Sequence, residues 1–309
     1  KNITPIFVDY EKFSFKGIFL QSKILKDIEK KVDIFFFPHI NLPLYIPKNT
    51  ITTIHDLRCF TNYWDRSYFN KYIFTYLLKR ALKKSKQIIS ISKTVENAII
   101  EKLAIKNNKI ITIYEYIDDK FLNLDFNKKA IVKEPYILFV GNRKKHKNLY
   151  NLIKAFILVK EKIPHKIIIA GARDKGLDEV DILKKQLNVE DRIIDFISPA
   201  DDVITNLYQN ADLFVFPSLF EGFGLPPLEA ISCGCPVIAS NIPVLREILG
   251  DEIACFNPLD IHDIANKILV GLEHTEELYE KGKERLKMFN KDKIIQQYID
   301  VFENIINER

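Results

Sequence analysis

The sequence predicts an α/β protein with two doubly wound parallel-sheet domains. Its 309 residues are too many for one typical domain and suit two. Short continuous apolar runs of strand length alternate with amphipathic stretches of helical period, which is typical of parallel sheets covered by helices on both faces. The apolar fraction of 47% and the charged fraction of 28% are those of a globular chain. No run of about 18 uncharged apolar residues predicts a transmembrane helix.

The alternation is most regular in the second half, where we expect one domain over residues 134–291. Its strands are predicted at Tyr136–Val140, Lys166–Ala170, Arg192–Ile197, Leu213–Phe216 and Pro236–Ala239. Its helices are predicted at Asn148–Lys162, Asp178–Leu187, Asp201–Gln209 and Leu228–Ser232. Domains of this kind bind ligands in the crevice at the carboxyl ends of their strands.

The first half is predicted to form a shorter α/β domain over residues 1–133, with the boundary near Asn127–Glu134. Its strands are predicted at Thr4–Asp9, Ile34–Pro38, Ile51–His55 and Gln87–Ser92. Its helices are predicted near Leu20–Lys31 and Arg66–Lys84. A final amphipathic helix is predicted at Asp292–Asn307, because its apolar residues recur at helical spacing.

The charge differs between the two halves. Residues 1–133 carry 24 Lys and Arg against 13 Asp and Glu, a balance of +11, while residues 134–309 carry 22 against 28, a balance of −6. A basic half beside an acidic half indicates a directional anionic partner. The four cysteines indicate no disulfide framework, and no second Cys/His cluster near Cys233 and Cys235 completes a zinc site. We therefore expect buried thiols in a reducing cytosol.

The segment from Phe216 to Ser240 carries the strongest chemical signal. A buried strand ends at Phe216, Pro217 and Ser218 turn the chain, and Gly222 and Gly224 permit positive φ and close approach of a ligand. Two prolines follow that suit the first turn of a helix. The free N–H groups and positive dipole end of such a helix form an anion site. The alternative is a tight strand-to-helix turn that binds nothing.

Two carboxylates lie in this segment, Glu221 in the glycine-rich loop and Glu229 inside the helix. A glycoside hydrolase would use two carboxyls about 5–10 Å apart around one bond, and the irregular path between these residues does not exclude that arrangement. Separate roles are favoured, because a carboxylate beside a phosphate-binding helix start can accept hydrogen bonds from sugar hydroxyls.

This segment resembles the signature of glycosyltransferase family 4, whose members are retaining enzymes of the GT-B fold with two Rossmann-like doubly wound parallel-sheet domains. The shared pattern is Glu, seven residues, Glu, with Gly-Phe-Gly after the first Glu, here Glu221 and Glu229. The resemblance implies that Glu221 contacts the donor sugar and acts in catalysis, and that Glu229 holds the ribose hydroxyls. It also implies that the backbone at Phe223, Gly224 and Leu225 meets the diphosphate and sugar.

A second segment, Tyr136–Phe156, agrees with this resemblance. A strand ends at Gly141, and Asn142 is followed by five basic or His residues before a helix begins. Such cations suit a diphosphate, with Arg able to bind it bidentately, although a solvated basic loop is the alternative. The family's Gly, turn, Lys-Asn-Leu element implies that Lys147 is the phosphate-binding lysine. Arg143 is our choice for its catalytic companion. The expected donor-binding set also includes Gly141, Asn142, Ser198 and Ser218.

Two segments of the first half resemble the acceptor domain of bacterial polysaccharide members of the family. They contain His39, and His55 followed by Asp56, each near the end of a predicted strand. These three residues are the expected acceptor-side residues, with a strand-capping structural histidine as the alternative. Family members normally begin with a strand and a Gly-rich loop that this chain lacks, so we expect an incomplete N-terminal domain. The final helix, 292–309, resembles the one that crosses back to that domain.

Residues 66–86 contain seven basic residues and no acid, interleaved with aromatic and aliphatic residues. Such a helix can lie on an anionic membrane surface, and we expect a cytoplasmic protein that is peripheral on the inner face of a membrane. The alternative is an ordinary helix with its apolar face on the core. Nucleic acid is not an expected partner, because no recognised binding motif accompanies the basic residues.

The resemblance implies transfer of a sugar from a nucleoside-diphosphate sugar to a glycan or lipid-linked acceptor in surface polysaccharide synthesis, with retention of configuration. GDP-mannose is the first choice of donor, followed by UDP- or dTDP-linked sugars. We expect no metal and no cofactor, because no Asp-x-Asp motif stands at a suitable strand end and cations already face the diphosphate. The alternatives are a phosphorylase, a nucleotide-sugar epimerase, and a non-catalytic basic module that binds membranes.

Overall fold

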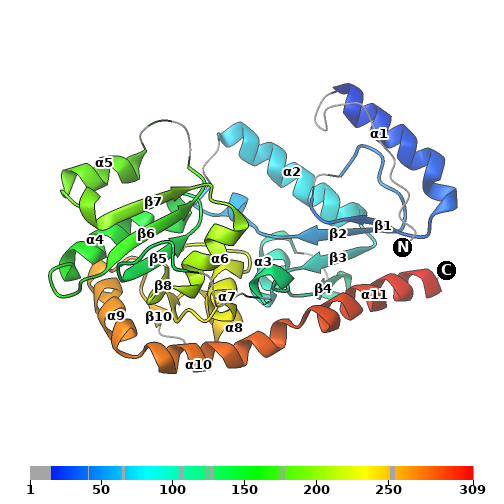
Figure 1. Ribbon diagram of the computed structural model, residues 1–309. Helices are drawn as coiled ribbons and strands as arrows, with labels where there is room; N and C mark the ends of the chain where they lie inside the picture. The colour runs from blue at the N-terminus through cyan, green and yellow to red at the C-terminus, as the bar shows by residue number, and fades with distance from the viewer. Residues whose placement is uncertain are drawn as a thin grey trace.

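The computed structural model describes residues 15–40, 42–64, 67–104, 107–122, 124, 129–173, 176, 178–250 and 255–308. Two parallel β-sheets, of four and six strands, are covered by helices, which confirms the predicted α/β architecture of two parallel-sheet domains (Figure 1). The strand predicted at Thr4–Asp9 lies outside the described residues. Among these residues, no helix is long and apolar enough to cross a membrane.

The first sheet has the order β1-β2-β3-β4, with every neighbouring pair parallel. Its strands are buried on both faces at the centre, where Ile51 and Ile54 on β2 are fully enclosed. Helices on both sides enclose it. The elements of this domain are α1 (Phe15–Ile28), β1 (Phe35–Phe37), β2 (Thr50–Ile54), α2 (Tyr68–Lys84), β3 (Gln87–Ser90), α3 (Lys93–Leu103) and β4 (Ile110–Thr112).

The second sheet has the order β10-β9-β8-β5-β6-β7, again with parallel pairs. Its strands are β5 (Tyr136–Val140), β6 (Lys166–Gly171), β7 (Ile193–Ile197), β8 (Leu213–Phe216), β9 (Val237–Ser240) and β10 (Cys255–Phe256). The chain builds outward from β5 through β6 to β7, then returns to β8 on the other side of β5. The crevice at such a reversal, beyond the carboxyl ends of the strands, is where doubly wound sheets bind ligands.

Helices cover both faces of the second sheet because its strands are apolar on both sides. On β5, Leu138 enters one buried cluster, whereas Ile137 and Phe139 enter the other. The helices that supply these faces are α4 (Leu149–Val159), α5 (Glu179–Gln186), α6 (Asp201–Gln209), α7 (Leu225–Ser232), α8 (Pro243–Leu249) and α9 (Ile261–Glu273).

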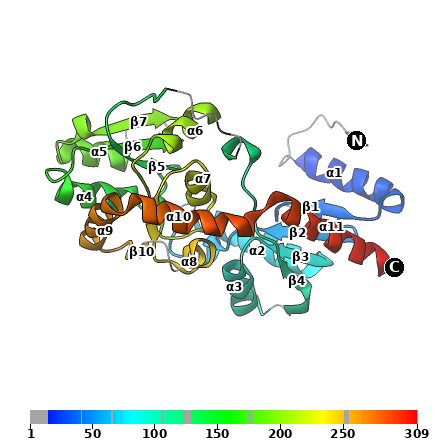
Figure 2. The same ribbon diagram turned by 60° about the horizontal axis from the view of Figure 1, so that its bottom comes forward.

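The chain ends by returning to the first sheet. Helix α10 (Thr275–Leu286) passes beneath the second domain in the view of Figure 1 and in front of it in Figure 2, and α11 (Lys291–Asn307) runs alongside the first sheet. The rings of Tyr298 and Phe302 on α11 lie 5.8 and 5.5 Å from the ring of Phe36 on β1. Lys86, just before β3, forms an ion pair of 3.0 Å with Glu308. The last helix is therefore packed on the N-terminal domain.

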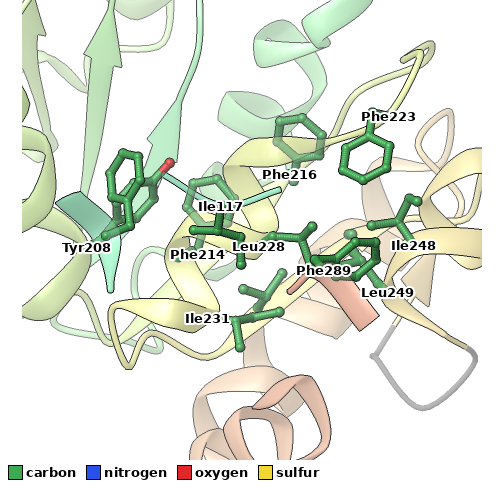
Figure 3. Close-up of a cluster of buried hydrophobic side chains, with 14 of the residues drawn as sticks. Ile117, Tyr208, Phe214, Phe216, Phe223, Leu228, Ile231, Ile248, Leu249 and Phe289 are labelled. Atoms are coloured by element: carbon green, nitrogen blue, oxygen red, sulfur yellow. The ribbon is translucent and has the colours of Figure 1, made fainter. Parts of the chain in front are cut away.

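One buried apolar cluster continues from one domain into the other. Phe214, Phe216 and Leu228 of the second domain share it with Ile51 and Ile89 of the first. Figure 3 shows its central part, where α7 and strand β8 meet the aromatic residue preceding α11, Phe289. Because apolar surface is buried on both sides, this contact holds the two domains together at the edge where their sheets face each other.

Candidate functional site

The two segments singled out in the sequence meet at the reversal of the second sheet. The loop after β5 runs from Gly141 to Lys147, and the loop after β8 runs from Pro217 to Gly224. The N–H of Leu219 in the second loop donates to the carbonyl of His146 in the first at 2.7 Å. This bond joins the two loops directly beyond the carboxyl ends of β5 and β8, which is the position expected for a ligand site.

Lys147 and Glu221 face each other across these loops. The Lys147 Nζ lies 2.6 Å from Glu221 Oε1, and the two side chains are only 13% and 14% exposed. The same Nζ lies 5.3 Å from the centre of the Phe216 ring, at the end of β8. The arrangement places one cation and one anion side by side at the switch point, so that a bound phosphate can contact the first and sugar hydroxyls the second.

The start of α7 supplies a second anion-binding feature. Gly224 caps the helix with a φ of 118°, a conformation that favours glycine, and an added Cβ would lie 2.8 Å from Leu245 Cδ2. Pro226 and Pro227 have no N–H, so the N–H groups of Gly224 and Leu225 are the donors that this first turn can offer. With the positive end of the helix dipole, they suit a phosphate or a developing negative charge.

Glu229 lies one turn further into α7 and is held by Tyr208 of α6. The Tyr208 hydroxyl donates to Glu229 Oε2 at 3.1 Å. Burial raises the pKa of Glu229 above its usual value, and the hydrogen bond from Tyr208 opposes that rise. Burial also raises the pKa of Tyr208, so the phenol stays protonated and acts as a donor. The carboxylate is thus oriented before any ligand binds.

The other predicted donor-side residues lie around the same edge. Asn142 Oδ1 accepts from the N–H of Lys144 at 3.2 Å and shapes the turn after Gly141. Ser218 is fully buried, and its hydroxyl has no hydrogen-bond partner among the described residues. Ser198 is exposed after β7 with a φ of 47°. Of these three residues, Ser218 is the one with a buried polar group that lacks a hydrogen-bond partner among the described residues.

The side chain of Phe223 is packed among aromatic residues. Its ring is buried and lies 6.0 Å from the Tyr114 ring and 5.6 Å from the Phe289 ring. Tyr114 follows the first sheet, so this aromatic contact attaches the glycine-rich loop to the N-terminal domain. Only the backbone of Phe223 is therefore available for the predicted contact with a donor.

For Arg143 the structure gives a different position from the predicted one. Its side chain is 5% exposed, and its guanidinium nitrogens lie 3.2 Å from Asp178, 2.9 Å from Asp181 and 2.7 Å from Asp195. These three carboxylates come from the N-cap of α5, from α5 itself and from β7. The physical reason is that a nearly buried Arg with three anionic partners gains more from them than from solvent. Arg143 here fixes the loop after β5.

The predicted acceptor-side residues lie against the donor loop. A Cβ added to Gly222 would fall 1.9 Å from the carbonyl oxygen of His55, so the two backbones touch. His55 Nδ1 lies 3.4 Å from Glu115, and Nε2 lies 2.7 Å from the carbonyl of Pro38, beside His39. The hydrogen bond with Glu115 raises the pKa of His55. The structure therefore places the backbone of His55 against Gly222, with the His55 ring on the carbonyl of Pro38.

Asp56 has a local role that the sequence did not indicate. Its Oδ1 accepts from the N–H of Arg58 at 2.8 Å and starts the short helix that follows. Arg58 in turn places its guanidinium 3.1 Å from His146 Nδ1 in the loop after β5. Asp56 thus positions a contact between the two domains.

Sequence reasoning missed a further contact between the domains. Glu247 on α8 accepts from the N–H groups of Lys93 and Thr94 at 2.6 and 2.8 Å, at the start of α3. Ser92, the cap of α3, donates its hydroxyl to the carbonyl of Gly222 at 2.8 Å. A carboxylate at a helix start is a favourable electrostatic contact, but its partner lies 154 residues away in the sequence. In the sequence, Ser92 as a helix-capping residue was the one feature of this contact that could be recognised.

Among the described residues, no group of three or more His, Cys, Asp or Glu side chains is placed to hold a metal ion. The cysteines of this part of the chain are free, and Cys59, Cys233 and Cys235 are buried. Burial raises the pKa of the Cys233 thiol to about 12, so it stays protonated near neutral pH.

The two-domain architecture with its site at the switch point is that of the GT-B fold. The structure is similar to sucrose-phosphate synthase from Thermosynechococcus elongatus, with a TM-score of 0.78 over 99% of this chain and 82% of that one, at 20% identity. The family model described as "Glycosyl transferases group 1" matches residues 122–288, more than half of the chain. The chain therefore belongs to the group 1 glycosyl transferases.

Curated relatives agree with this family. The chain is 32% identical over 222 residues to the O-antigen chain mannosyltransferase RfbU of Salmonella typhimurium, which covers 72% of this chain and 60% of that protein. It is 29% identical over 234 residues to the serotype-specific mannosyltransferase WbdA of Escherichia coli, which covers 71% of this chain and 28% of that protein. The chain thus spans less than two thirds of the length of both relatives.

Proposed function

We propose that this protein transfers a sugar from a nucleoside-diphosphate sugar to a hydroxyl of a glycan or lipid-linked acceptor in polysaccharide synthesis. The observation that carries the proposal is the ion pair of Lys147 and Glu221, 2.6 Å apart beside the start of α7 at the switch point. Membership of the group 1 glycosyl transferases supports it. The pair joins a cation suited to phosphate to a carboxylate suited to sugar hydroxyls.

For the donor we propose GDP-mannose first, with UDP- and dTDP-linked sugars next. The names of the two relatives, both mannosyltransferases, support mannose as the sugar. Glu229 would hold the ribose hydroxyls, because the bond from Tyr208 orients its carboxylate. Glu221 would hold hydroxyls of the sugar. Retention of the anomeric configuration is part of the proposal and follows the resemblance to family 4.

The chemistry needs stabilisation of the leaving diphosphate. As the bond between the sugar and the phosphate breaks, negative charge grows on the phosphate oxygens, and preorganised donors in a largely dry site lower the barrier. Lys147 and the N–H groups of Gly224 and Leu225 would supply this stabilisation. Arg143 would act indirectly, by holding the loop that carries Lys147. We propose that these groups meet the charge without a divalent metal, so that activity persists in EDTA.

A membrane surface is the proposed location of the acceptor. Helix α2 buries Leu78, Ala81 and Leu82 against the core. Its first turns instead expose aromatic residues, which are Tyr68 (90%), Phe69 (72%), Tyr72 (75%) and Tyr76 (59%). Residues 67–86 contain bases and no acids. Exposed aromatic rings beside lysines suit the interface of an anionic bilayer. Flotation with anionic and neutral vesicles tests this membrane binding. The variant Tyr68→Ser/Phe69→Ser/Tyr72→Ser should no longer bind the anionic vesicles.

The function is tested by incubating the protein with labelled GDP-mannose and a lipid-linked glycan extract, with and without EDTA. Labelled glycan that depends on Glu221 supports the proposal. A changed nucleotide sugar formed without an acceptor would indicate an epimerase, and phosphate-dependent release of a sugar phosphate would indicate a phosphorylase. Vesicle binding by a protein that binds no nucleotide would indicate the non-catalytic module.

A further inference from the structure

A hollow of about 870 Å³ is lined by residues of both domains, including the loop after β5. Asn62 and Trp64 come from the loop that follows β2. The opposite wall comes from two segments of the second domain. The β5–α4 region contributes Lys144, Lys145, Asn148, Leu149 and Tyr150. The start of α5 contributes Asp178, Glu179, Val180 and Ile182. Its volume is in the range of small-molecule sites, about 300–1,000 Å³.

Two aromatic side chains line this hollow, and each is partly exposed with a neighbouring side chain against its ring. The ring of Trp64 lies 5.4 Å from the Phe74 ring, and its Nε1 donates to the carbonyl of Ser67 at 3.2 Å. Tyr150 is 43% exposed, and Lys154 Nζ lies 4.5 Å from its ring. Rings held by neighbours offer flat apolar surface at small entropic cost. Such surface suits the apolar C–H faces of sugar rings.

The charges of the hollow largely cancel. Lys145 and Glu179 form an ion pair of 3.4 Å, and Arg143 lies 3.2 Å from Asp178. Charged, amide and aromatic groups therefore line the same space without a strong net field, which argues against a polyanion as the ligand. A neutral ligand with many hydroxyls matches both the polar groups and the rings, because hydroxyls can donate to carboxylates and accept from lysines.

Both walls of the hollow lie within a few residues of the ion pair of Lys147 and Glu221. Lys145 lies two residues before Lys147, in the same loop. Tyr63, next to Trp64, has its ring 6.5 Å from the ring of Phe220, which precedes Glu221. The hollow therefore adjoins the two loops that carry Lys147 and Glu221.

We propose that the hollow is a saccharide subsite that holds the neutral oligosaccharide portion of the acceptor, with Trp64 and Tyr150 as its platforms. This inference rests on the proposed function, since it names how the same site selects its acceptor. Trp64 and Tyr150 are specificity-determining residues in this account and take no part in the chemical step.

The chain contains a single tryptophan, so its fluorescence reports on this hollow directly. Short neutral oligosaccharides of mannose, galactose and N-acetylglucosamine are titrated while tryptophan emission is followed. A saturable change with at least one of them is expected. No change with any of them, in a protein that still binds a nucleotide, would overturn the proposal and leave the proposed function standing.

Calorimetry with variants adds a second readout. Tyr150→Ala and Trp64→Ala should each weaken oligosaccharide binding by about tenfold or more, and Trp64→Phe should keep most of the affinity for the oligosaccharide. Nucleotide affinity should stay within about twofold in all three, because neither ring touches the donor loops' ion pair. Tyr279→Ala is the matched control, since Tyr279 has Lys283 5.7 Å from its ring on α10, outside the hollow. Equal losses in Tyr279→Ala and Tyr150→Ala would contradict a specific subsite.

Discussion

Lys147 and Glu221 are 74 residues apart in the sequence, yet the Lys147 Nζ lies 2.6 Å from the Glu221 carboxylate. The pair closes the space between the loops after β5 and β8, where the strand order of the second sheet reverses. Each group neutralises the other while no donor is bound. In the proposed function, a nucleotide sugar would offer Lys147 a phosphate and Glu221 a set of hydroxyls, so that binding would replace the ion pair with a contact to each group.

Lys147→Met is expected to lower kcat by about 100-fold or more, because it removes a preorganised cation from the leaving diphosphate. It also leaves Glu221 nearly buried without its partner, which should cost up to about 3 kcal/mol of stability. The double variant Lys147→Met/Glu221→Gln should regain most of the stability and none of the activity. Urea denaturation and the transfer assay measure the two effects. A near-normal kcat in Lys147→Met would contradict the assigned role.

Arg143→Met is expected to act on stability. Its removal takes the shared cation from Asp178, Asp181 and Asp195. Because Arg173 still pairs with Asp181 and Lys184 with Asp195, we expect a cost of about 1–3 kcal/mol, below the value of about 3–5 kcal/mol for an uncompensated buried charge. Lys145→Ala is the matched control, since Lys145 is 79% exposed in its pair with Glu179 and should matter by less than about 1 kcal/mol. If Arg143→Met instead weakens nucleotide binding with unchanged stability, Arg143 contacts the diphosphate as the sequence predicted.

Gly222→Ala is expected to disturb the approach of the two domains. The added Cβ would lie 1.9 Å from the His55 carbonyl, a backbone atom that cannot rotate away. The loop or the domains must separate, so transfer should fall while nucleotide affinity changes little. Kinetics, calorimetry and small-angle scattering together test this, with a larger radius of gyration expected. A fully active variant of unchanged dimensions would show that the contact is absent in solution.

The ionisation of His55 is expected to depend on Glu115. Their hydrogen bond raises the pKa of His55 above its usual value of about 6.5. A raised pKa means that the pair stabilises the fold below about pH 6.5 and that this contribution is lost as the pH rises through the pKa of the folded state. An NMR titration of the imidazole should show a lower midpoint in Glu115→Gln than in the unsubstituted protein. Identical midpoints would rule out the interaction.

Much of the fold was readable from the sequence because the second sheet is buried on both faces. Continuous apolar runs predicted Tyr136–Val140 and Leu213–Phe216 with the bounds that β5 and β8 have. Helix α7 begins at Leu225 rather than Leu228, since Pro226 and Pro227 occupy its first turn. Helix α3 was not predicted from the sequence, although Ser92 caps it, because its apolar face is short.

The site was readable only in part, because a sequence shows residue types and not their partners. The spacing of Glu221 and Glu229 and the basic loop with Lys147 predicted the carboxyl edge of the second sheet, where these two segments meet. Nothing in the chain order indicates that Arg143 finds three carboxylates on α5 and β7, since those contacts form only when the sheet assembles. The bond from Tyr208 to Glu229 and the contact of Gly222 with His55 are tertiary in the same way.

The central claim is a nucleotide-sugar site at the carboxyl edge of the second sheet, and calorimetry with GDP, UDP, dTDP and ADP tests it most directly. Glu229→Ala should bind about tenfold more weakly or not at all, with Tyr208→Phe between it and the unsubstituted protein, because the phenol orients the carboxylate. We expect one nucleotide to bind with micromolar affinity. Absence of binding by the folded protein, or equal binding by Glu229→Ala, would contradict the account.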